Sequence, residues 1–239
     1  MATGPELIVV ELGRTRYAEA WELQRRVFQA RQEGRIGDTL LLTEHEHVYT
    51  LGKGADENHL LAKDEELSLR GVEVFRIDRG GDITYHGPGQ LVGYPILDLT
   101  GHYQDIHRYL REMESVIIDT LAEYGVEGGR EPEFTGVWSG GEKVAAIGVK
   151  VSRWVTMHGF ALNVSTDLSY FDRIIPCGIF HKGVTSLQNI LGRECVLSDV
   201  QARLVRHFSE RFRRKVKQTS PDELKTLLRH PEALIEEHR

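Results

Sequence analysis

Residues 72–97 read VEVFRIDRGGDITYHGPGQLVGYPIL, which is an apolar strand, a glycine-rich loop and a second apolar strand. The flanking runs, Val72–Ile77 and Leu91–Leu97, have the length and composition of strands. Between them, four glycines and a proline within residues 79–90 exclude a regular helix. Loops of this kind bring the backbone close to a ligand. The stretch therefore predicts a sheet that carries a binding loop, although a tight multi-turn loop without function has the same composition.

The loop matches neither of the glycine-rich motifs that bind nucleotides. It lacks the Gly-Lys-Ser/Thr of a P-loop, and no G-x-G-x-x-G opens a helix after a strand. The charge and the cysteine spacing also argue against a nucleic-acid-binding surface and a zinc site. A formal charge of −6 gives no broad footprint for nucleic acid, and no Cys/His spacing of the zinc type occurs, so we expect neither nucleic acid nor a metal.

Before and after this loop, the predicted strands and helices do not follow strict βαβ alternation. Apolar periodicity predicts helices over 16–33 and 103–125, and a capping box at Ser198-x-x-Gln201 predicts one that continues to about 217. Ser220-Pro221-x-Glu223 opens a last short helix. Strands are predicted over 7–12, 40–43 and 155–164, a strand that ends in a loop over 45–54, and a hairpin over 134–138 and 143–151. The fold class is an α/β or α+β domain with a mixed β-sheet and flanking helices.

Length and composition fit one globular catalytic domain. We place it at residues 1–218 of the 239, with residues 219–239 as a C-terminal helical extension of unassigned role. The first residues have no basic region or long apolar run, and no stretch has the length of a membrane span. We therefore expect a cytoplasmic protein that uses no membrane, and a monomer by default.

Two cysteines are present, and one of them lies where a nucleophile is accessible. Cys177 sits between Pro176 and Gly178 in a predicted loop, whereas Cys195 fits a buried structural residue. A thiol with an ordinary pKa is only about 3% thiolate at neutral pH, so a nucleophilic cysteine needs a neighbouring cation or base. The side chains that fit this role by type are Lys143, His86, His158, Lys150 and His181.

Taken together, these segments resemble the bacterial lipoyl(octanoyl) transferases over residues 8–215. The family pattern R-G-G-x-x-T-aromatic-H-x-x-G-Q is present as Arg79 to Gln90, and Lys-x-x-x-x-Gly as Lys143 to Gly148. The His-Gly-x-Ala-Leu-Asn pattern is present as His158 to Asn163, and Pro-Cys-Gly-Ile as Pro176 to Ile179. Order and spacing are preserved, and no motif position departs from the pattern.

The resemblance implies the fold of the biotin/lipoate protein ligase catalytic domain. It implies that Cys177 is the nucleophile and that Lys143 lowers its pKa, with His158 in a supporting position. It further implies that an acyl pocket is lined by Arg79, Gly80, Gly81, Asp82, Ile83, Thr84, Tyr85, His86, Ala146, Ile147, Gly148, Gly159, Phe160 and Ala161.

The implied activity is octanoyl transfer without a cofactor, the first step of endogenous protein lipoylation. The donor is octanoyl-acyl carrier protein. The acceptors are lysines of lipoyl domains in 2-oxoacid dehydrogenase E2 subunits and of the glycine cleavage H protein. Transfer through a thioester on Cys177 is covalent catalysis with ping-pong kinetics. Lys143, His86 and His158 all remain candidates for the general base.

Three other functions fit parts of the sequence. A lipoate or biotin ligase of the same superfamily activates its acid with ATP and needs no cysteine. A thiol hydrolase uses Cys177 with His86 or His158 and transfers the acyl group to water. A non-catalytic acyl-binding protein binds the octanoyl carrier and never acquires an acyl group itself.

The predicted helix over 198–217 is strongly basic. Its cations are Arg203, Arg206, Arg211, Arg213, Arg214, Lys215 and Lys217. Such a helix fits a docking face for acidic acyl carrier protein, and equally a solvated helix face.

Overall fold

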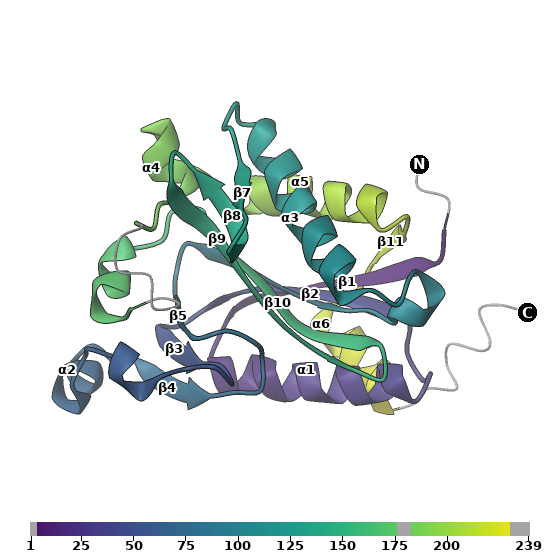
Figure 1. Cartoon of the computed structure of the whole chain (residues 1–239). Helices are drawn as coiled ribbons and strands as arrows, with labels where there is room; N and C mark the ends of the chain where they lie inside the picture. The colour runs from purple at the N-terminus through teal and green to yellow at the C-terminus, as the bar shows by residue number, and fades with distance from the viewer. Residues whose placement is uncertain (1–3, 176–182, 230–239) are drawn as a thin grey trace, which may run out of the picture.

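A computed structural model describes residues 4–175 and 183–229 of the chain (Figure 1). The first half contains β1 (Glu6–Thr15), α1 (Tyr17–Gln32), β2 (Asp38–His45), β3 (Val48–Leu51), α2 (Asp64–Leu69), β4 (Glu73–Arg76), β5 (Ile83–His86) and β6 (Gln90–Ile96). The second half contains α3 (Ile106–Ala122), β7 (Gly129–Glu131), β8 (Phe134–Ser139), β9 (Glu142–Ser152), β10 (Val155–Asn163), α4 (Leu187–Leu191), α5 (Leu197–Arg211), β11 (Lys215–Gln218) and α6 (Pro221–Arg229). Three single-turn or two-turn 3₁₀ helices, at Glu57–His59, Leu99–Gly101 and Leu168–Arg173, lie in the connections.

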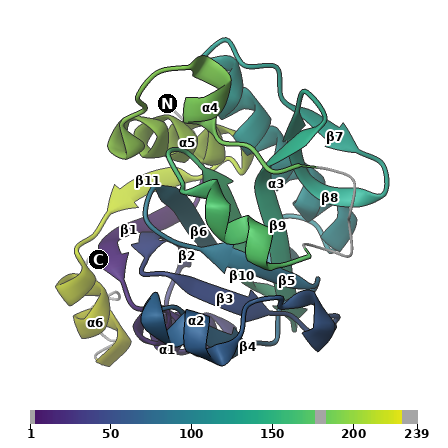
Figure 2. The ribbon, with the colours of Figure 1, turned by 90° about the vertical axis from the view of Figure 1, so that its left-hand side faces the viewer.

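The main sheet has eight strands in the order β11-β1-β2-β6-β10-β9-β8-β7. Its β11-β1-β2 part is parallel and the remainder is antiparallel, so the predicted mixed sheet is confirmed. A second sheet has three strands in the order β4-β3-β5. Figure 2 turns this end of the molecule toward the viewer, with α2 and β4 at the bottom and α4 above.

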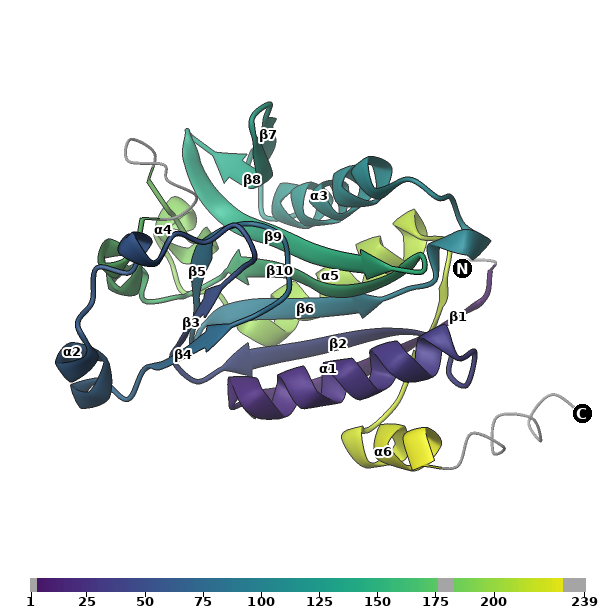
Figure 3. The same cartoon turned by 60° about the horizontal axis from the view of Figure 1, so that its bottom comes forward.

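Helices cover both faces of the main sheet, as Figure 3 shows for α1 on one side and α3 and α5 on the other. Alternate residues of one strand serve the two layers: Leu7 and Val9 pack under α3 and α5, while Ile8 and Val10 pack under α1 and α6. The central strands are therefore apolar on both faces, which is why Leu91–Leu97 has the composition of a buried strand. No helix among the described residues has the length and apolarity to cross a membrane.

Most predicted elements are confirmed, and three local predictions are wrong. The 79–90 stretch is not loop throughout, because Ile83–His86 forms β5 and pairs with β3. α5 begins after Val196 with no side-chain cap, so Ser198 does not form a capping box. The same helix ends at Arg211 rather than near residue 217. By contrast, the capping box of Ser220 and Glu223 is present in both directions, at 2.7 and 3.2 Å.

The predicted helical end of 198–217 is instead an edge strand. β11 pairs in parallel with β1, from Glu6 opposite Lys215 to Val9 opposite Gln218. α6 follows and buries Leu224 completely in the layer under α1. The predicted boundary at residue 218 therefore falls between two elements that both pack on the main sheet.

A buried ion cluster fixes this edge. Arg214 precedes β11 and donates from Nε and Nη2 to Asp38 Oδ2, at 3.0 and 2.7 Å. Asp38, at the start of β2, also accepts from Arg31 Nε at 2.9 Å and from the Asp98 backbone N–H at 2.9 Å. Both Arg214 and Asp38 are buried. One carboxylate thus joins β11, α1 and the end of β6.

Replacing Asp38 by Ala leaves the buried Arg214 guanidinium without its counter-ion. We expect the free energy of unfolding to fall by about 3 to 5 kcal/mol. Urea denaturation monitored by circular dichroism measures it. Asp222, an exposed partner of Lys225 in α6, provides the matched control, and Asp222→Ala is expected to leave the midpoint unchanged. Equal midpoints for the two variants would contradict this role of Asp38.

Candidate active site

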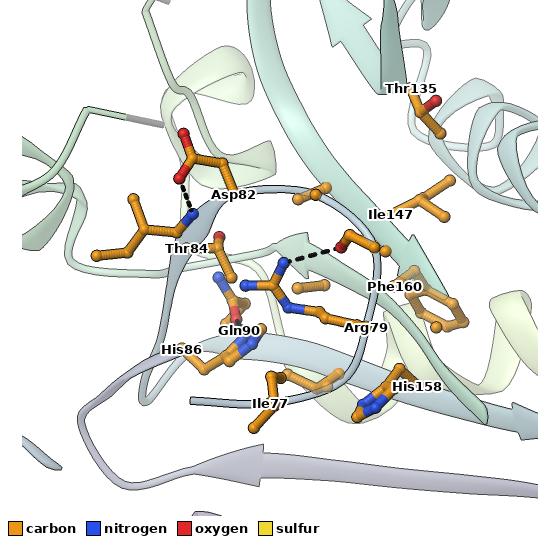
Figure 4. A pocket seen from close by; sticks show the side chains of 18 of the residues that line it. Ile77, Arg79, Asp82, Thr84, His86, Gln90, Thr135, Ile147, His158 and Phe160 are labelled. Atoms are coloured by element: carbon orange, nitrogen blue, oxygen red, sulfur yellow. Dashed lines mark hydrogen bonds between the residues drawn. The ribbon is translucent and has the colours of Figure 1, made fainter. Parts of the chain in front are cut away.

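One pocket lies where the glycine-rich loop crosses β9 and β10 (Figure 4). All of the residues predicted from the motifs to form a pocket line it, with one exception, and Lys143 and His158 line it as well. The exception is Tyr85, which faces the core of the small sheet, is fully buried and bonds His47 Nδ1 through its hydroxyl at 2.7 Å. Tyr85 therefore does not line this pocket, because its ring packs in the core cluster of the small sheet with Tyr49 and Tyr170.

The loop is held against β9 by its own backbone and against β3 by the Arg79 side chain. Gly80 N–H donates to Val149 O at 2.9 Å, and Arg79 Nη2 donates to Thr50 O and Oγ1 at 2.6 and 2.9 Å. Figure 4 shows the Arg79 guanidinium in the middle of the pocket residues. The crossing is close: a Cβ on Gly148 would lie 3.0 Å from Gly80 O and 3.2 Å from Arg79 Cδ. Gly148 therefore sets the distance between the loop and β9.

A β-bulge in β9 decides which face carries Lys143. Val137 pairs with Ala145, but the next residue, Trp138, pairs with Lys143 and not with Val144. Strict alternation would put Lys143 on the same face as Ala145. The extra residue instead leaves Val144 and Ala145 both in the core, and Lys143 and Ala146 both on the pocket.

The residues that follow 176–182 in the sequence hydrogen-bond to the backbone of Lys143. Lys143 N–H donates to Gly183 O, and Thr185 N–H donates to Lys143 O, both at 2.9 Å. On the other side of the gap, Ile175 N–H donates to His59 O at 2.9 Å. His59 Nδ1 in turn lies 2.5 Å from Oδ2 of the pocket residue Asp82. Cys177 itself, like His181, lies outside the described residues.

A chain of hydrogen bonds through two buried amides connects the glycine-rich loop to the segment 183–185. His86 Nδ1 lies 2.8 Å from Gln90 Oε1, Gln90 Nε2 donates to Asn163 Oδ1 at 2.9 Å, and Asn163 Nδ2 donates to Thr185 O at 3.0 Å. Because Thr185 O only accepts, each amide has one orientation. Gln90 Oε1 therefore faces His86, so Nδ1 of His86 carries the proton and the ring is fixed as one neutral tautomer.

Burial shifts the histidines in and beside the pocket toward their neutral forms. Burial, and then the neighbouring His45, lower the pKa of His86 to about 3. Burial also lowers the pKa of His45 to about 4, where the ring bonds the Tyr94 hydroxyl at 2.6 Å. His158 has a pKa lowered by burial, against the opposing effect of Asp78, which lies 2.8 Å from its Nε2. His86 is thus a neutral hydrogen-bonding residue and a weak base at neutral pH.

His158 occupies an unusual backbone position. Its φ is +60°, in the left-handed region, within β10 and next to Gly159. Asp78 holds the ring from outside the pocket and is itself paired with Lys150 at 2.6 Å. The hydrogen bond from His158, and the contact with Lys150, hold the pKa of Asp78 well below its usual range, so the pair is a carboxylate and a histidine donor. Strain of this kind concentrates at functional sites.

Several pocket residues were not predicted as site residues. They are Tyr17, Ile77, Gln90, Val92, Tyr94, Thr135, Asn163, Phe171 and Val184. Gln90 and Asn163 lie within the quoted motifs, so their motif positions were a usable signal. Tyr17 and Tyr94 come from a helix start and a buried strand, where nothing in the local sequence distinguishes a pocket residue from a core residue.

The basic segment 198–217 does not form a free cationic face among the described residues. Arg203 and Arg206 both pair with Glu123 of α3, and Arg211 pairs with Asp119 at 2.7 Å. The structure therefore removes most of the basis for a docking face on α5. Cys195 is buried in the core, which confirms its structural interpretation. Within 4–175 and 183–229, no group of His, Cys, Asp and Glu side chains is suited to hold a metal ion.

Comparisons with known proteins agree with this architecture. The model of the lipoyl protein ligase A/B catalytic domain matches residues 16–209. An octanoyltransferase of Rubrobacter xylanophilus is 58% identical over 200 residues, which cover 83% of this chain and 90% of that protein. An octanoyltransferase of Solibacter usitatus is 54% identical over 202 residues, which cover 84% and 91%. Among solved structures, lipoate-protein ligase A bound with ATP has a TM-score of 0.75 at 16% identity, over 95% of this chain and 94% of that one.

The two buried histidines make folding pH-dependent. Their pKa values, about 4 for His45 and about 3 for His86, lie below the unfolded value near 6.5. Stability is therefore complete above pH 6.5 and is lost as pH falls from 6.5 toward 4 and then 3, by up to about 1.4 kcal/mol per pH unit for each ring.

His86→Gln removes one of these titrations while its amide still faces Gln90. Urea unfolding between pH 4.5 and 6.5 is expected to show a shallower loss of stability in this variant than in the wild type. The exposed His107 provides the control, and His107→Gln is expected to keep the wild-type slope. A His86→Gln slope equal to that of the wild type would show that His86 does not titrate as a buried neutral ring.

Proposed function

Because this chain belongs to the lipoyl protein ligase A/B catalytic-domain family, we propose that its pocket holds an octanoyl group as a thioester on Cys177 and delivers it to a lysine of a lipoyl domain. The chain is an octanoyltransferase, an acyltransferase of protein lipoylation, like its relatives at 54% and 58% identity. The observation that carries the proposed mechanism is the β9 bulge, which places Lys143 at the pocket, with its backbone bonded to Gly183 and Thr185, shortly after the Cys177 segment in the sequence.

In the first step the Cys177 thiolate attacks the octanoyl carbonyl carbon of the donor thioester. The new C–S bond forms as the bond to the donor sulfur breaks, and the departing thiolate takes a proton, for which the Lys143 ammonium is the source. One thioester replaces another, so little free energy is lost. A cationic lysine near the sulfur favours the thiolate form of the cysteine.

In the second step the acceptor lysine amine attacks the acyl-enzyme. The amide C–N bond forms, the C–S bond to Cys177 breaks, and the amine proton passes to Lys143 as general base. Among the three candidate bases, the pKa of about 3 makes His86 unsuitable. His158 directs Nε2 at Asp78 and lies on β10 at the opposite end of the pocket wall from Lys143. We therefore assign the base role to Lys143.

The pocket wall suits an aliphatic chain. Ala146, Ile147, Phe160 and Ala161 come from paired positions of β9 and β10, with Phe160 opposite Ile147 and Ala161 opposite Ala146. Figure 4 shows Ile147 and Phe160 together on one side of the pocket. Each methylene buried there contributes about 0.8 kcal/mol, which is the physical basis for selecting octanoyl over shorter chains.

Octanoyltransferase activity requires two partners, an acyl donor and a lipoyl acceptor. We propose octanoyl-acyl carrier protein as the donor, and E2 lipoyl domains and the glycine cleavage H protein as acceptors. No step needs a cofactor. The monomeric state, the cytoplasmic location and the domain boundary at residue 218 stay predictions from the sequence.

Cys177→Ala is expected to abolish acylation of the enzyme by octanoyl-pantetheine, measured by intact mass. Lys143→Met is expected to slow it by about 100-fold or more, since a positioned acid–base group contributes that much. Lys150→Met, a lysine on the same strand that pairs with Asp78, is the matched control and should acylate at close to the wild-type rate.

Product analysis separates the alternative functions. ATP-dependent octanoylation of a lipoyl domain by Cys177→Ala with free octanoate would establish a ligase instead. Release of free octanoate at the same rate with and without a lipoyl domain would establish a hydrolase. Tight binding of the octanoyl donor without an adduct would establish a binding protein.

Gly148→Val should narrow the pocket, because the added atoms meet Gly80 O and Arg79 Cδ. In the wild type, kcat/KM is expected to fall about fourfold for each methylene removed from the donor. The variant should lose most activity with octanoyl-pantetheine and little with butanoyl-pantetheine. A uniform loss over all chain lengths would show that Gly148 does not limit the acyl pocket.

A further inference from the structure

Two residues of β8 contact the side chain of Lys143. Lys143 Nζ lies 4.8 Å from the centroid of the Trp138 ring. A Cβ on Gly136 would lie 3.5 Å from Lys143 Cε, so the lysine stem runs in contact distance of a position without a side chain. The absence of a side chain at Gly136 leaves room for the methylene stem of Lys143. The Trp138 ring lies beside the amine at the end of that stem. Together they fix the direction in which the lysine leaves β9.

The Trp138 ring is itself held in place. Its side chain is buried, and its Nε1–H donates to Phe134 O at 3.4 Å. The Phe134 ring packs against it with centroids 6.2 Å apart. Because Trp138 is the register partner of Lys143 across the bulge, both side chains leave the same face of the sheet. The ring is therefore a rigid platform beside the lysine amine.

β8 is anchored from behind by a buried carboxylate. Glu114 of α3 is fully buried, and its Oε1 accepts from Gly136 N–H at 3.2 Å. Its Oε2 accepts from Arg111 and Arg130 at 2.7 and 2.8 Å. These bonds fix the β8 backbone at the glycine that the lysine stem passes. The β8 backbone next to the Trp138 ring is thus tied to the helix layer.

We propose that Trp138 is a positioning residue for octanoyl transfer, whose ring holds the Lys143 ammonium at the pocket wall and favours its charged form. The inference rests on the proposed function, in which Lys143 acts on the reacting atoms. An aromatic face attracts an ammonium through its quadrupole, and tryptophan does so more strongly than phenylalanine. A neutral amine has no such attraction, so the ring favours protonated Lys143 at the start of each transfer.

Other charged groups surround Lys143 and are unchanged in the variants below. Glu142 precedes it on β9, and Glu114 lies behind Gly136. The titratable and charged residues that share the pocket with it are Tyr17, Arg79, Asp82, His86, Tyr94 and His158. A difference between variants at position 138 therefore reports the ring.

The test is NMR titration of the full chain labelled with ¹³C at lysine Cε, with the Lys143 signal assigned by its loss in Lys143→Arg. We expect the pKa of Lys143 to fall by about 0.5 to 1.5 pH units in Trp138→Leu, and by less in Trp138→Phe. The upfield ring-current shift of the Lys143 Hε protons should disappear in Trp138→Leu. Trp154→Phe, an aromatic replacement away from the pocket, should change neither quantity.

A Lys143 pKa that is equal in the wild type, Trp138→Phe and Trp138→Leu would overturn the inference. The upper limb of the pH profile for acylation by octanoyl-pantetheine should move to lower pH by the same amount in Trp138→Leu. Since the NMR titration needs no reaction, it separates the two proposals. If Lys143→Met is acylated at the wild-type rate, the role of Lys143 is wrong even where the titration shows the contact with Trp138.

Discussion

One extra residue in β9 sets up the whole candidate site. Without the bulge at Val144, the alternation of a strand would bury Lys143 against the helix layer and direct Val144 at the pocket. In that layer the lysine ammonium would lie among apolar side chains. Burying its charge without a partner would cost several kcal/mol. With the bulge, two apolar residues enter the core in succession, and the cation faces the pocket. The proposed mechanism, the position of Trp138 and the pairing with residues 183–185 all depend on this local register.

Around that position the protein uses short-range polar contacts to make the pocket rigid. Hydrogen bonds run from His86 through Gln90 and Asn163 to the carbonyl oxygen of Thr185. The Thr185 N–H in turn donates to Lys143 O. The glycine-rich loop and the segment 183–185 are therefore linked through buried amides. A displacement of either end would leave buried amide groups without hydrogen-bond partners, which is costly. Such rigidity suits a site whose two steps share one acyl position.

The sequence predicted the parts of this site that are local. Lys143 and all but one of the residues that the motifs assigned to the pocket wall line the pocket, although other lining residues were not predicted. Strand composition predicted the mixed sheet. It did not predict β11, because that strand exists only through pairing with β1, more than two hundred residues earlier, and its lysines also fit a helix. Tyr85 was expected in the pocket wall because the motif was taken as a continuous run, whereas its ring packs in the core of the small sheet. The bulge has no sequence signal either, since Lys143-Val144-Ala145 fits a regular strand equally well.

The most direct measurement is a crystal structure of the enzyme with an octanoyl group trapped on Cys177. The account predicts that Nζ of Lys143 lies within about 4 Å of Cys177 Sγ or of the thioester carbonyl. It also predicts that the chain runs along Ala146 and Ile147 toward Phe160. An adduct whose sulfur lies more than about 8 Å from Nζ, with Lys143 still against Trp138, would contradict it.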